Sequence, residues 1–462
     1  MSAVIQSSNA LLASPIASGG GDRAIAFDAG GEVTLATFLA QVRGVAAALP
    51  AGGHAVNLCE DRYRFLVAFC AIALRGQVNL LPPSRAPAVV DEVLAQHADS
   101  YCVGDAVLDP SPPRYWRLPG RLPELDGEAP QLDEHALVAI GFTSGSTGSP
   151  QENPKTWGNF RASTAQNLAV LADLWSAGET PHVVATVPPQ HMYGMELSVL
   201  LPLLGGAAVH AARPFFPEDI ARALHQASAP RLLVTTPVHL RALVASGVSL
   251  PSLVGIVSAT APLSPELAAA AEARFGCEVR ELFGSTETCV IARRRTAHES
   301  AWTPLPGVRL VPQPDGTAVH GPHLATPVTL ADLIELVDNG RLDNGSEADG
   351  RFHLRGRNAD LLEIAGKRAS LGDMTRKLLA IPGVEDGVVF QLDEAGPDGV
   401  RRVAALAVAP DLDEGAILAA LRRCIDPVFL PRPLKRVPRL PRNETGKLPR
   451  QALAALLQSS DP

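Results

Sequence analysis

The chain has 462 residues, enough for about three folding units or for one large domain with a small one. Hydrophobic residues make up 46% of the chain and charged residues 19%, which excludes a disordered or collagen-like protein. The 40 Lys and Arg residues against 48 Asp and Glu give a formal net charge of −8, which argues against a general nucleic-acid binder.

Nothing in the cysteines or the apolar stretches indicates a secreted or membrane protein. No two of the six cysteines form a Cys-x-x-Cys pair, so neither a zinc site nor a disulfide framework is expected, and Cys70 is expected to be a buried thiol. Residues 1–20 lack the basic start of a signal peptide, and Glu196 and Pro202 interrupt the apolar stretch 195–212. We expect a cytoplasmic protein that does not enter a membrane.

Strand and helix patterns alternate along most of the chain. Strands are predicted at 54–59, 77–81, 136–143, 183–187, 206–210, 231–235, 253–258 and 278–283. Helices are predicted at 35–48, 61–75, 87–97, 157–174, 195–204, 217–227, 237–246 and 264–275. Thr34 and Ser264 occupy expected N-cap positions, and Pro265 suits a first helical position. The alternation predicts right-handed βαβ units and an α/β fold with mostly parallel sheets.

The pattern changes after about residue 300. Residues 306–357 are predicted as short strands with polar turns. A smaller unit follows, with helices at 370–380 and 413–424 and strands at 384–391 and 402–409. We therefore predict a large multi-layer N-terminal domain, 1–357, and a small mobile C-terminal α+β domain, 358–462.

A run of hydroxyl and glycine residues follows the predicted strand 136–143. Such a run exposes backbone N–H groups and hydroxyl donors, which can form a nest for phosphate oxygens. It is not a Walker A loop, because no Gly-Lys-Ser/Thr follows. A plain Gly/Ser turn remains the alternative. The candidate phosphate-binding residues are Thr143, Ser144, Gly145, Ser146, Thr147 and Gly148.

Two more strand ends carry candidate functional residues. His191 lies where ligands bind in open α/β sheets, although a lone His is more often structural. Near the end of strand 278–283, Phe283 can stack on a flat ring, Thr286 can donate to phosphate, and Glu287 is a hard oxygen ligand suited to Mg²⁺. The alternative for this last segment is a capped turn with a solvated Glu.

The segment 432–450 is rich in Lys and Arg and has a single acid, Glu444. Such a charge run is usually only a solvated face. On its Gly-containing turn, however, Lys447 can be brought to an anionic transition state.

Taken in this order, the segments resemble those of the adenylate-forming superfamily, which comprises acyl- and aryl-CoA synthetases, peptide-synthetase adenylation domains and luciferases. The resemblance runs from about residue 30 to 455 and rests on residues 143–150, 187–194, 258–263, 283–287, 356–368 and 441–450. It implies an AMP-forming acid–thiol ligase that makes an acyl- or aryl-adenylate from ATP, with Mg²⁺, and then forms a thioester.

The resemblance also implies roles for individual residues. Lys447, His191 and Thr286 would be catalytic, Glu287 would hold the metal, and Gly366 would line a tunnel for the thiol arm. The nucleotide would be held by the phosphate-binding run together with Ala259, Thr260, Phe283, Gly284, Ser285, Asp332, Arg357 and Arg368. The acyl group would contact Met192, Tyr193, Gly194 and Ser258.

The expected partners are an aromatic or fatty acid and, as acceptor, CoA or a separate acyl carrier protein. Three residues depart from the superfamily pattern: Gln151 stands where a Lys is common, and Ala359 and Glu363 differ in the hinge segment. Either Lys155 replaces the missing charge or the phosphates have one cation fewer. These departures motivate the alternative of a non-catalytic nucleotide-binding protein on the same fold. A Rossmann-type dehydrogenase is disfavoured because no Gly-x-Gly-x-x-Gly follows the first strand.

Overall fold

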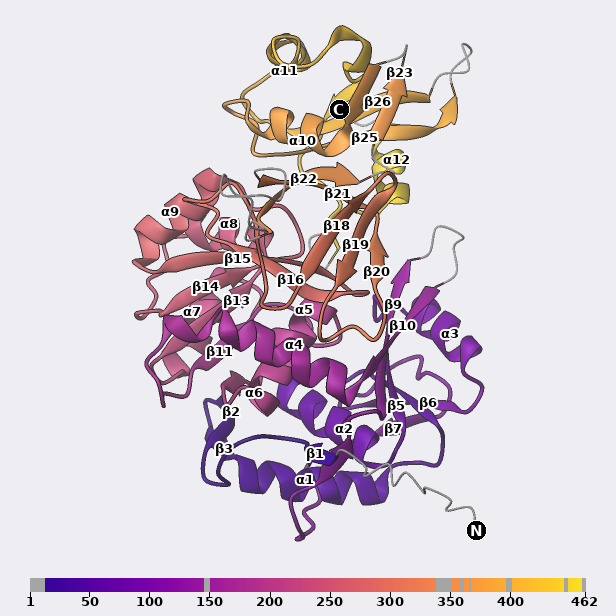
Figure 1. Ribbon diagram of the computed structural model, residues 1–462, viewed down its shortest axis with the longest axis vertical. Helices are drawn as coiled ribbons and strands as arrows, with labels where there is room; N and C mark the ends of the chain where they lie inside the picture. Colours follow the sequence, from indigo (N-terminus) through magenta and orange to yellow (C-terminus); the bar gives the residue numbers. More distant parts are fainter. Residues whose placement is uncertain are drawn as a thin grey trace, which may run out of the picture. The chain divides into compact units, whose positions relative to one another are not determined.

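The computed structural model describes residues 13–144, 150–337, 350–357, 361–364, 367–395, 401–443 and 448–458 (Figure 1). The chain divides into two compact units. The first comprises Met1–Glu299, Leu305–Val308 and Gly321–Thr326, and the second comprises Ser300–Pro304, Arg309–His320 and Pro327–Pro462. The boundary predicted after residue 357 falls within the second unit and stays a prediction, because compactness alone does not locate a hinge.

One sheet of the first unit has six strands in the order β10-β9-β5-β4-β6-β7. Only the β9–β10 hairpin is antiparallel; the other neighbours pair in parallel. Strand β10 was not predicted, and its two prolines, Pro150 and Pro154, fit its place at the sheet edge. The strands are β4 His54–Asn57, β5 Val78–Leu81, β6 Ser100–Gly104, β7 Tyr115–Arg117, β9 Leu137–Ser144 and β10 Pro150–Thr156.

The other large sheet of the first unit runs in the order β16-β15-β14-β13-β11-β12-β2-β3. Its inner pairs are parallel and its two outer pairs are antiparallel. A small separate sheet pairs β1 (Ala13–Pro15) with β8 (Gln131–Asp133). The large sheet contains β2 Ala24–Asp28, β3 Gly31–Thr34, β11 His182–Ala185, β12 Ala208–His210, β13 Arg231–Thr235, β14 Gly255–Ser258, β15 Glu278–Ser285 and β16 Cys289–Arg294.

Helices connect the parallel strands and confirm the predicted α/β alternation. Thr34 and Ser264 are N-caps, as predicted: their side chains accept hydrogen bonds from the backbone N–H groups of Thr37 and Leu267. The helices are α1 Leu35–Ala48, α2 Arg62–Leu74, α3 Pro87–Gln96, α4 Trp157–Ala169, α5 Met192–Met195, α6 Leu201–Leu204, α7 Pro217–Gln226, α8 Pro237–Ala245 and α9 Pro265–Phe275, with a 3₁₀ turn at Ala172–Leu174.

The helix predicted at 195–204 differs from the structure. It begins earlier, at Met192, and widens into a π-helical segment, Glu196–Leu200, between α5 and α6. Pro202 supplies no N–H for the regular ladder, and the Ser198 hydroxyl donates to the Gly194 carbonyl at 2.6 Å. A single regular helix is therefore not formed here.

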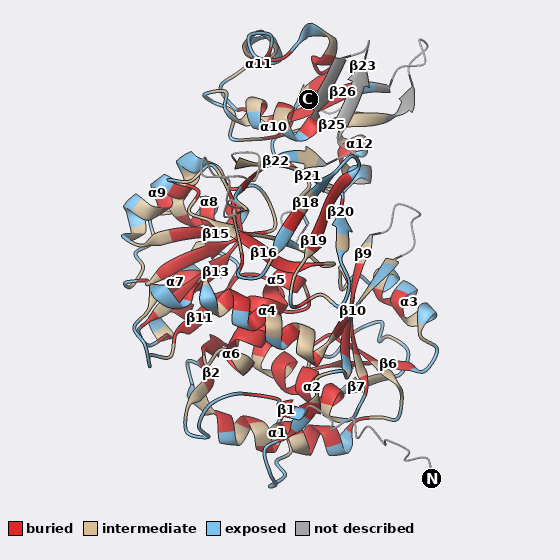
Figure 2. Cartoon of the chain, in the orientation of Figure 1, coloured by how far each residue is buried: buried red, intermediate tan, exposed pale blue. Residues whose placement is uncertain are grey.

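Helix α2 lies in the core of the first unit. Every residue from Phe65 to Ala73 is buried, so this helix is apolar on all sides (Figure 2). Cys70 is fully buried, as predicted, and burial raises the pKa of its thiol. At the start of the helix, the buried Arg62 donates to the carbonyls of Ala185 and Val187, each at 2.9 Å, and so fixes the end of β11.

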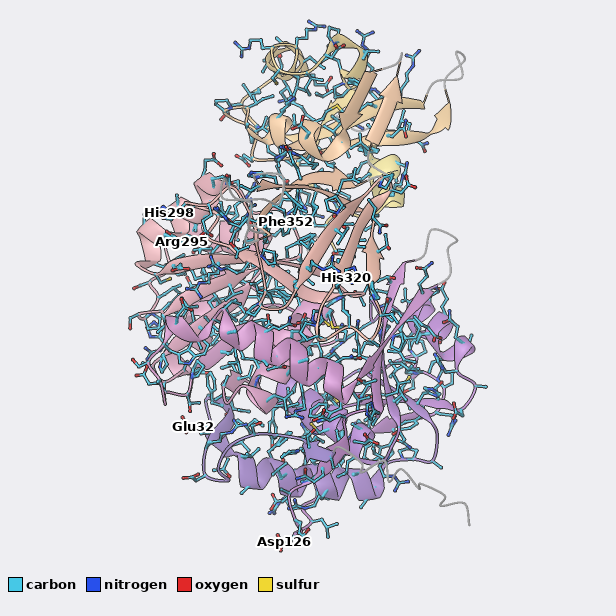
Figure 3. All side chains as sticks on the ribbon, in the orientation of Figure 1. Glu32, Asp126, Arg295, His298, His320 and Phe352 are labelled. Carbon is cyan, nitrogen blue, oxygen red and sulfur yellow. The ribbon has the colours of Figure 1, made fainter. Side chains whose placement is uncertain are left out.

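The second unit combines helices with small sheets that are antiparallel except for the parallel pair β26–β27. Trp302 and Phe352, both buried, exchange backbone hydrogen bonds; Phe352 is labelled in Figure 3. No helix in the described part of the chain is both long and apolar enough to cross a membrane. The elements are β17 Thr303–Pro304, β18 Arg309–Gln313, β19 Gly316–His320, β20 Val328–Leu330, β21 Asp332–Leu336, β22 Phe352–Arg357, β23 Leu361–Ile364, β24 Lys367–Ser370, α10 Leu371–Leu379, β25 Asp386–Ala395, β26 Arg401–Val408, α11 Glu414–Leu421, a 3₁₀ turn Pro427–Phe429, β27 Leu434–Arg436 and α12 Arg450–Gln458.

Candidate active site

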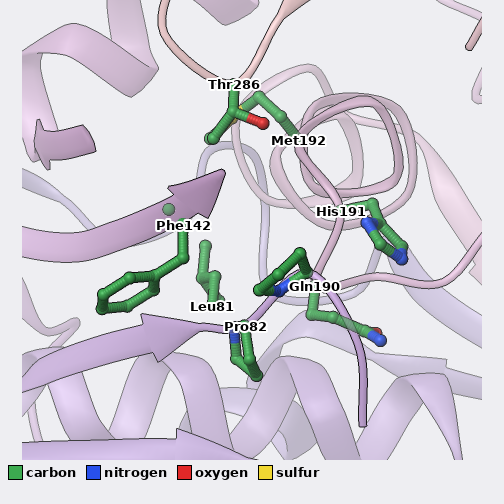
Figure 4. Close-up of a pocket in the computed structure, with 9 residues that line it drawn as sticks. Leu81, Pro82, Phe142, Gln190, His191, Met192 and Thr286 are labelled. Carbon is green, nitrogen blue, oxygen red and sulfur yellow. The ribbon is translucent and has the colours of Figure 1, made fainter. Parts of the chain in front are cut away.

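A narrow recess in the first unit lies where the carboxyl ends of strands from both large sheets meet (Figure 4). One wall comes from β9 and the residues after β5, and the other from segments that follow β11 and β15. The space between the atoms is about 210 Å³, mouth included. The recess is lined by Leu81, Pro82, Pro83, Gly141, Phe142, Gln190, His191, Met192 and Thr286. The segments around His191 and Thr286, both singled out in the sequence, thus meet the strand that precedes the predicted phosphate loop.

Gly141 allows the closest approach between the two walls. A Cβ atom at this position would lie 2.7 Å from the Cγ2 atom of Thr286 and 3.4 Å from the terminal methyl carbon of Met192. The first distance is shorter than van der Waals contact allows, so only glycine leaves Thr286 in its place. Gly141 falls inside the predicted strand 136–143 and was not among the predicted site residues. A glycine within a strand often marks a close approach of another group, and this was the available signal.

The turn between β15 and β16 carries Thr286 and Glu287. The Ser285 hydroxyl accepts a hydrogen bond from the N–H of Thr288 at 3.2 Å, which closes the turn. A Cβ atom on Gly284 would lie 2.2 Å from the Cys289 carbonyl oxygen, so this position also requires glycine. The side chains of Phe283, Ser285, Thr286 and Glu287 are all partly exposed and accessible to a ligand.

Three buried side chains hold the backbone of this turn. The Lys155 ammonium donates to the backbone carbonyl of Glu287 at 2.6 Å, and the Nε2 atom of His323 lies 2.7 Å from the backbone carbonyl of Thr288. The Glu196 carboxylate accepts from the N–H of Val290 at 3.0 Å. All three side chains are at least 95% buried, while Gln151 is exposed. This geometry favours the expectation that the phosphates have one cation fewer over replacement of the missing charge by Lys155.

The segment around His191 leads into a buried helix. His191 is the N-cap residue of α5 and is partly buried, whereas Met192 and Tyr193 are buried. The Tyr193 hydroxyl donates to the Val257 carbonyl at 2.9 Å, and burial raises the pKa of this phenol. A Cβ atom on Gly194 would lie 1.9 Å from the Pro188 carbonyl oxygen, so glycine is needed for this tight turn.

The predicted adenine-side loop follows β14. Ser258 is fully buried, and its hydroxyl has no hydrogen-bond partner among the described residues. Ala259 is also buried, and Thr260 has a φ of 81° in the left-handed region. The Leu263 N–H donates to the Glu281 carboxylate at 2.9 Å, so the loop is fastened to the strand that leads to Phe283.

The predicted phosphate loop connects β9 to β10. Thr143 is partly buried, and Ser144 ends β9 opposite Pro150. Gly145, Ser146, Thr147 and Gly148 lie outside the described residues. The hairpin nevertheless places both ends of the loop beside the recess, since Gly141 and Phe142 belong to β9.

In the second unit, Asp332 and Arg357 are directly opposite each other on the antiparallel strands β21 and β22. The Thr317 hydroxyl donates to the Asp332 carbonyl at 2.6 Å. Both residues are expected to hold the nucleotide, and their register brings their backbones together. Arg368 lies in β24 opposite Glu363, whereas Gly366, Ala359 and Lys447 lie outside the described residues.

A family model described as AMP-binding enzyme matches residues 16–356. A 4-coumarate–CoA ligase of Halorhodospira halophila is 31% identical over 71% of this chain and 78% of its own length. The enterobactin synthase component F of Escherichia coli K12 is 28% identical over 71% of this chain, which spans 29% of that protein. The ATP-bound crystal structure of MatB from Rhodopseudomonas palustris has the same fold, with a TM-score of 0.78, 20% identity and coverage of 95% of this chain and 96% of that one.

The chain belongs to the AMP-binding enzyme family, within the adenylate-forming superfamily that its motifs resemble. It is an AMP-forming acid–thiol ligase, which uses ATP to convert a carboxylate into an adenylate and then passes the acyl group to a thiol. The predicted fold class and activity are therefore confirmed.

Proposed function

We propose that this ligase activates an aromatic or fatty acid and transfers it to CoA or to a separate acyl carrier protein. The main support is the recess in which Thr286, His191 and the phosphate-loop strand meet. The 4-coumarate–CoA ligase relative supports an aromatic acid as substrate and CoA as acceptor. The enterobactin synthase component relative fits a carrier protein as acceptor.

The residues that border the recess suit the first half-reaction. Bringing a carboxylate to a triphosphate joins two anions, so donors must be positioned before the reaction. We propose that Thr286 donates to the α-phosphate and that His191, on the same wall of the recess, orients the carboxylate. Phe283 and Ala259 would flank the adenine, and Thr260, Gly284 and Ser285 would border the nucleotide. Met192, Tyr193, Gly194 and Ser258 would shape the acyl end.

The donor set also fits Mg²⁺. The Glu287 carboxylate is a partly exposed hard oxygen ligand beside Thr286, and magnesium is commonly held by one or two carboxylates together with substrate phosphates. Among the described residues, no group of three or more His, Cys, Asp or Glu side chains could hold a metal ion. We propose that Glu287 holds Mg²⁺, which would neutralise phosphate charge.

The remaining assignments follow the superfamily resemblance. The hydroxyl and glycine residues at 143–148 would cradle the phosphates, and Asp332 with Arg357 would hold the ribose. Lys447 would stabilise the charge that develops as the adenylate forms. A small domain of residues 358–462 would rotate between the half-reactions, so that Gly366 admits the thiol arm and Arg368 contacts phosphate.

The test is pyrophosphate exchange with a panel of aryl and fatty acids. The proposal expects exchange that depends on one class of acid and is lost in Glu287→Ala, followed by thioester formation when CoA or a carrier protein is offered. ATP binding without exchange for any acid would contradict the catalytic proposal and support the alternative of a non-catalytic nucleotide-binding protein. Thioester formation with only one acceptor decides between CoA and a carrier protein.

A further inference from the structure

Lys155 is a buried cation at the back of the candidate active site. Lysine is rare in this chain, occurring only at positions 155, 367, 377, 435 and 447. Lys155 lies on β10, the strand that follows the phosphate loop, and only 5% of its surface is exposed. Burying an ammonium is costly unless a hydrogen-bond acceptor compensates it. The Glu287 carbonyl is that acceptor, at 2.6 Å.

This hydrogen bond is made to the peptide group between Glu287 and Thr288. The carbonyl oxygen of this peptide accepts from Lys155, and its N–H, which belongs to Thr288, donates to the Ser285 hydroxyl at 3.2 Å. A cation on the carbonyl polarises the peptide and strengthens its N–H as a donor. Lys155 therefore stabilises the closed turn on which Thr286 and Glu287 are presented.

The charges around Lys155 also favour this role. The Glu196 carboxylate, fully buried, has its pKa raised by burial, while hydrogen bonds from Ser163, Val290 and Asn167 and the charge of Lys155 oppose that rise. Lys155 also lowers the pKa of His323, although burial is the larger cause. Lys155 is thus close to Glu196 and His323, the side chains that hold the backbone at the β16 end of the turn.

We propose that Lys155 is a positioning residue that fixes Thr286 and Glu287 toward Mg·ATP through the Glu287 peptide. This inference rests on the proposed function of those two residues. In this role Lys155 supports the backbone of the turn and does not contact the phosphates. It also links the strand leaving the phosphate loop with the turn carrying the metal ligand, so both would shift together if the bond were lost.

The experiment compares Lys155→Met and Lys155→Arg with Lys435→Met as a matched control. Lys435 also donates to a backbone carbonyl, that of Leu456 at 2.9 Å, but lies in the second unit. Binding of Mg·ATP is measured by calorimetry, and the KM values for Mg·ATP and for the acid are measured by pyrophosphate exchange. Thermal unfolding reports on the fold.

Lys155→Met is expected to weaken Mg·ATP binding about 10- to 100-fold, the usual effect of losing a hydrogen bond to a charged group. The KM for the acid should stay near the wild-type value. Lys155→Arg should restore part of the affinity, because a guanidinium can donate to the same carbonyl. Lys435→Met should leave Mg·ATP binding unchanged.

Wild-type affinity in Lys155→Met would overturn the inference. So would an equal loss of acid and nucleotide affinity that Lys155→Arg does not restore, since that is the signature of a merely structural residue. If Lys155→Met does not fold, Lys155→Arg decides: it must bind Mg·ATP more weakly than the wild type while its KM for the acid is unchanged. Absence of acid-dependent exchange in the wild type would contradict the proposed function instead, and the calorimetric comparison would still test Lys155.

Discussion

The Cα atom of Gly141 faces the methyl group of Thr286 so closely that a Cβ atom there would lie only 2.7 Å from it. This contact joins β9 to the turn after β15, so two residues far apart in the sequence meet with no room for a side-chain atom on Gly141.

Gly141→Ala should therefore displace Thr286 and slow acid-dependent pyrophosphate exchange. A displacement of about 1 Å at a reacting centre can cost about 100-fold in rate. The measurement is kcat/KM for ATP. Gly247→Ala is the matched control, because a Cβ atom at Gly247 meets nothing within 4 Å. Equal rates in the two variants would show that the contact does not matter for activity.

Glu281 is predicted to be a major contributor to stability. Its buried carboxylate accepts from Leu263 N–H, from Arg294 Nε at 2.7 Å and from the Thr296 hydroxyl at 2.6 Å. Removing one partner of a buried ion pair typically costs about 3–5 kcal/mol, so Glu281→Ala should lower the free energy of unfolding by about that amount. Chemical denaturation measures the change.

The control for Glu281 is Glu335→Ala in the second unit. Glu335 is exposed and pairs with Arg355, and exposed pairs contribute about 0–1 kcal/mol. Similar losses in both variants would contradict the importance assigned to burial.

His239 should make the first unit less stable in acid. Its Nδ1 atom lies 2.9 Å from the Thr186 hydroxyl and 3.1 Å from that of Thr236, and burial lowers its pKa to about 4. An unfolded His titrates near 6.5, so between these values the unfolded chain binds more protons than the folded chain. This contribution to stability is therefore complete above pH ~6.5 and is lost as the pH falls toward ~4.

The loss attributable to His239 is about 1–3 kcal/mol between pH 7 and pH 4. The free energy of unfolding of wild type and His239→Gln, measured across this range, should diverge in slope, with the variant less dependent on pH. Parallel curves would assign the acid sensitivity to other groups.

Rapid thiol reactivity should be confined to one position in the folded protein. Cys424 is exposed, whereas burial raises the pKa of Cys102, Cys277 and Cys289 to about 12. Because the thiolate is the reactive form, an aromatic disulfide reagent should modify Cys424 rapidly, the partly exposed Cys277 much more slowly, and the buried Cys102 and Cys289 only after unfolding. Cys424→Ser should remove the fast phase, and a remaining fast phase would point to an opening of the core.

Much of the fold could be predicted because local patterns decide it. Thr34 and Ser264 correctly indicated helix starts, and the helix predicted at 61–75 with a buried Cys70 is present as Arg62–Leu74. The π-helical segment at Glu196–Leu200 and the edge strand β10 were not predicted. Both lie near prolines, which lack a backbone N–H, so their structure depends on which other groups form the remaining hydrogen bonds.

The candidate site was predictable as residue types but not as contacts. Strand ends identified Thr286, Glu287 and His191, since the carboxyl edge of an α/β sheet is where ligands bind. The approach of Gly141 to Thr286 depends on how two sheets pack, which no local pattern encodes. Likewise, the sequence left open whether Lys155 replaces the missing phosphate cation, and only the structure shows that the buried ammonium donates to the Glu287 carbonyl.

The two walls of the recess come from different sheets, so the width of the recess and the donor Thr286 can be changed independently. Leu81 ends a strand of one sheet and is followed by Pro82 and Pro83, whereas Thr286 follows a strand of the other sheet. Enlarging or reducing the first wall alters the width available to an occupant without replacing the donor on the second. Residues 81–83 can therefore be varied to change the width of the recess while Thr286 is left unchanged.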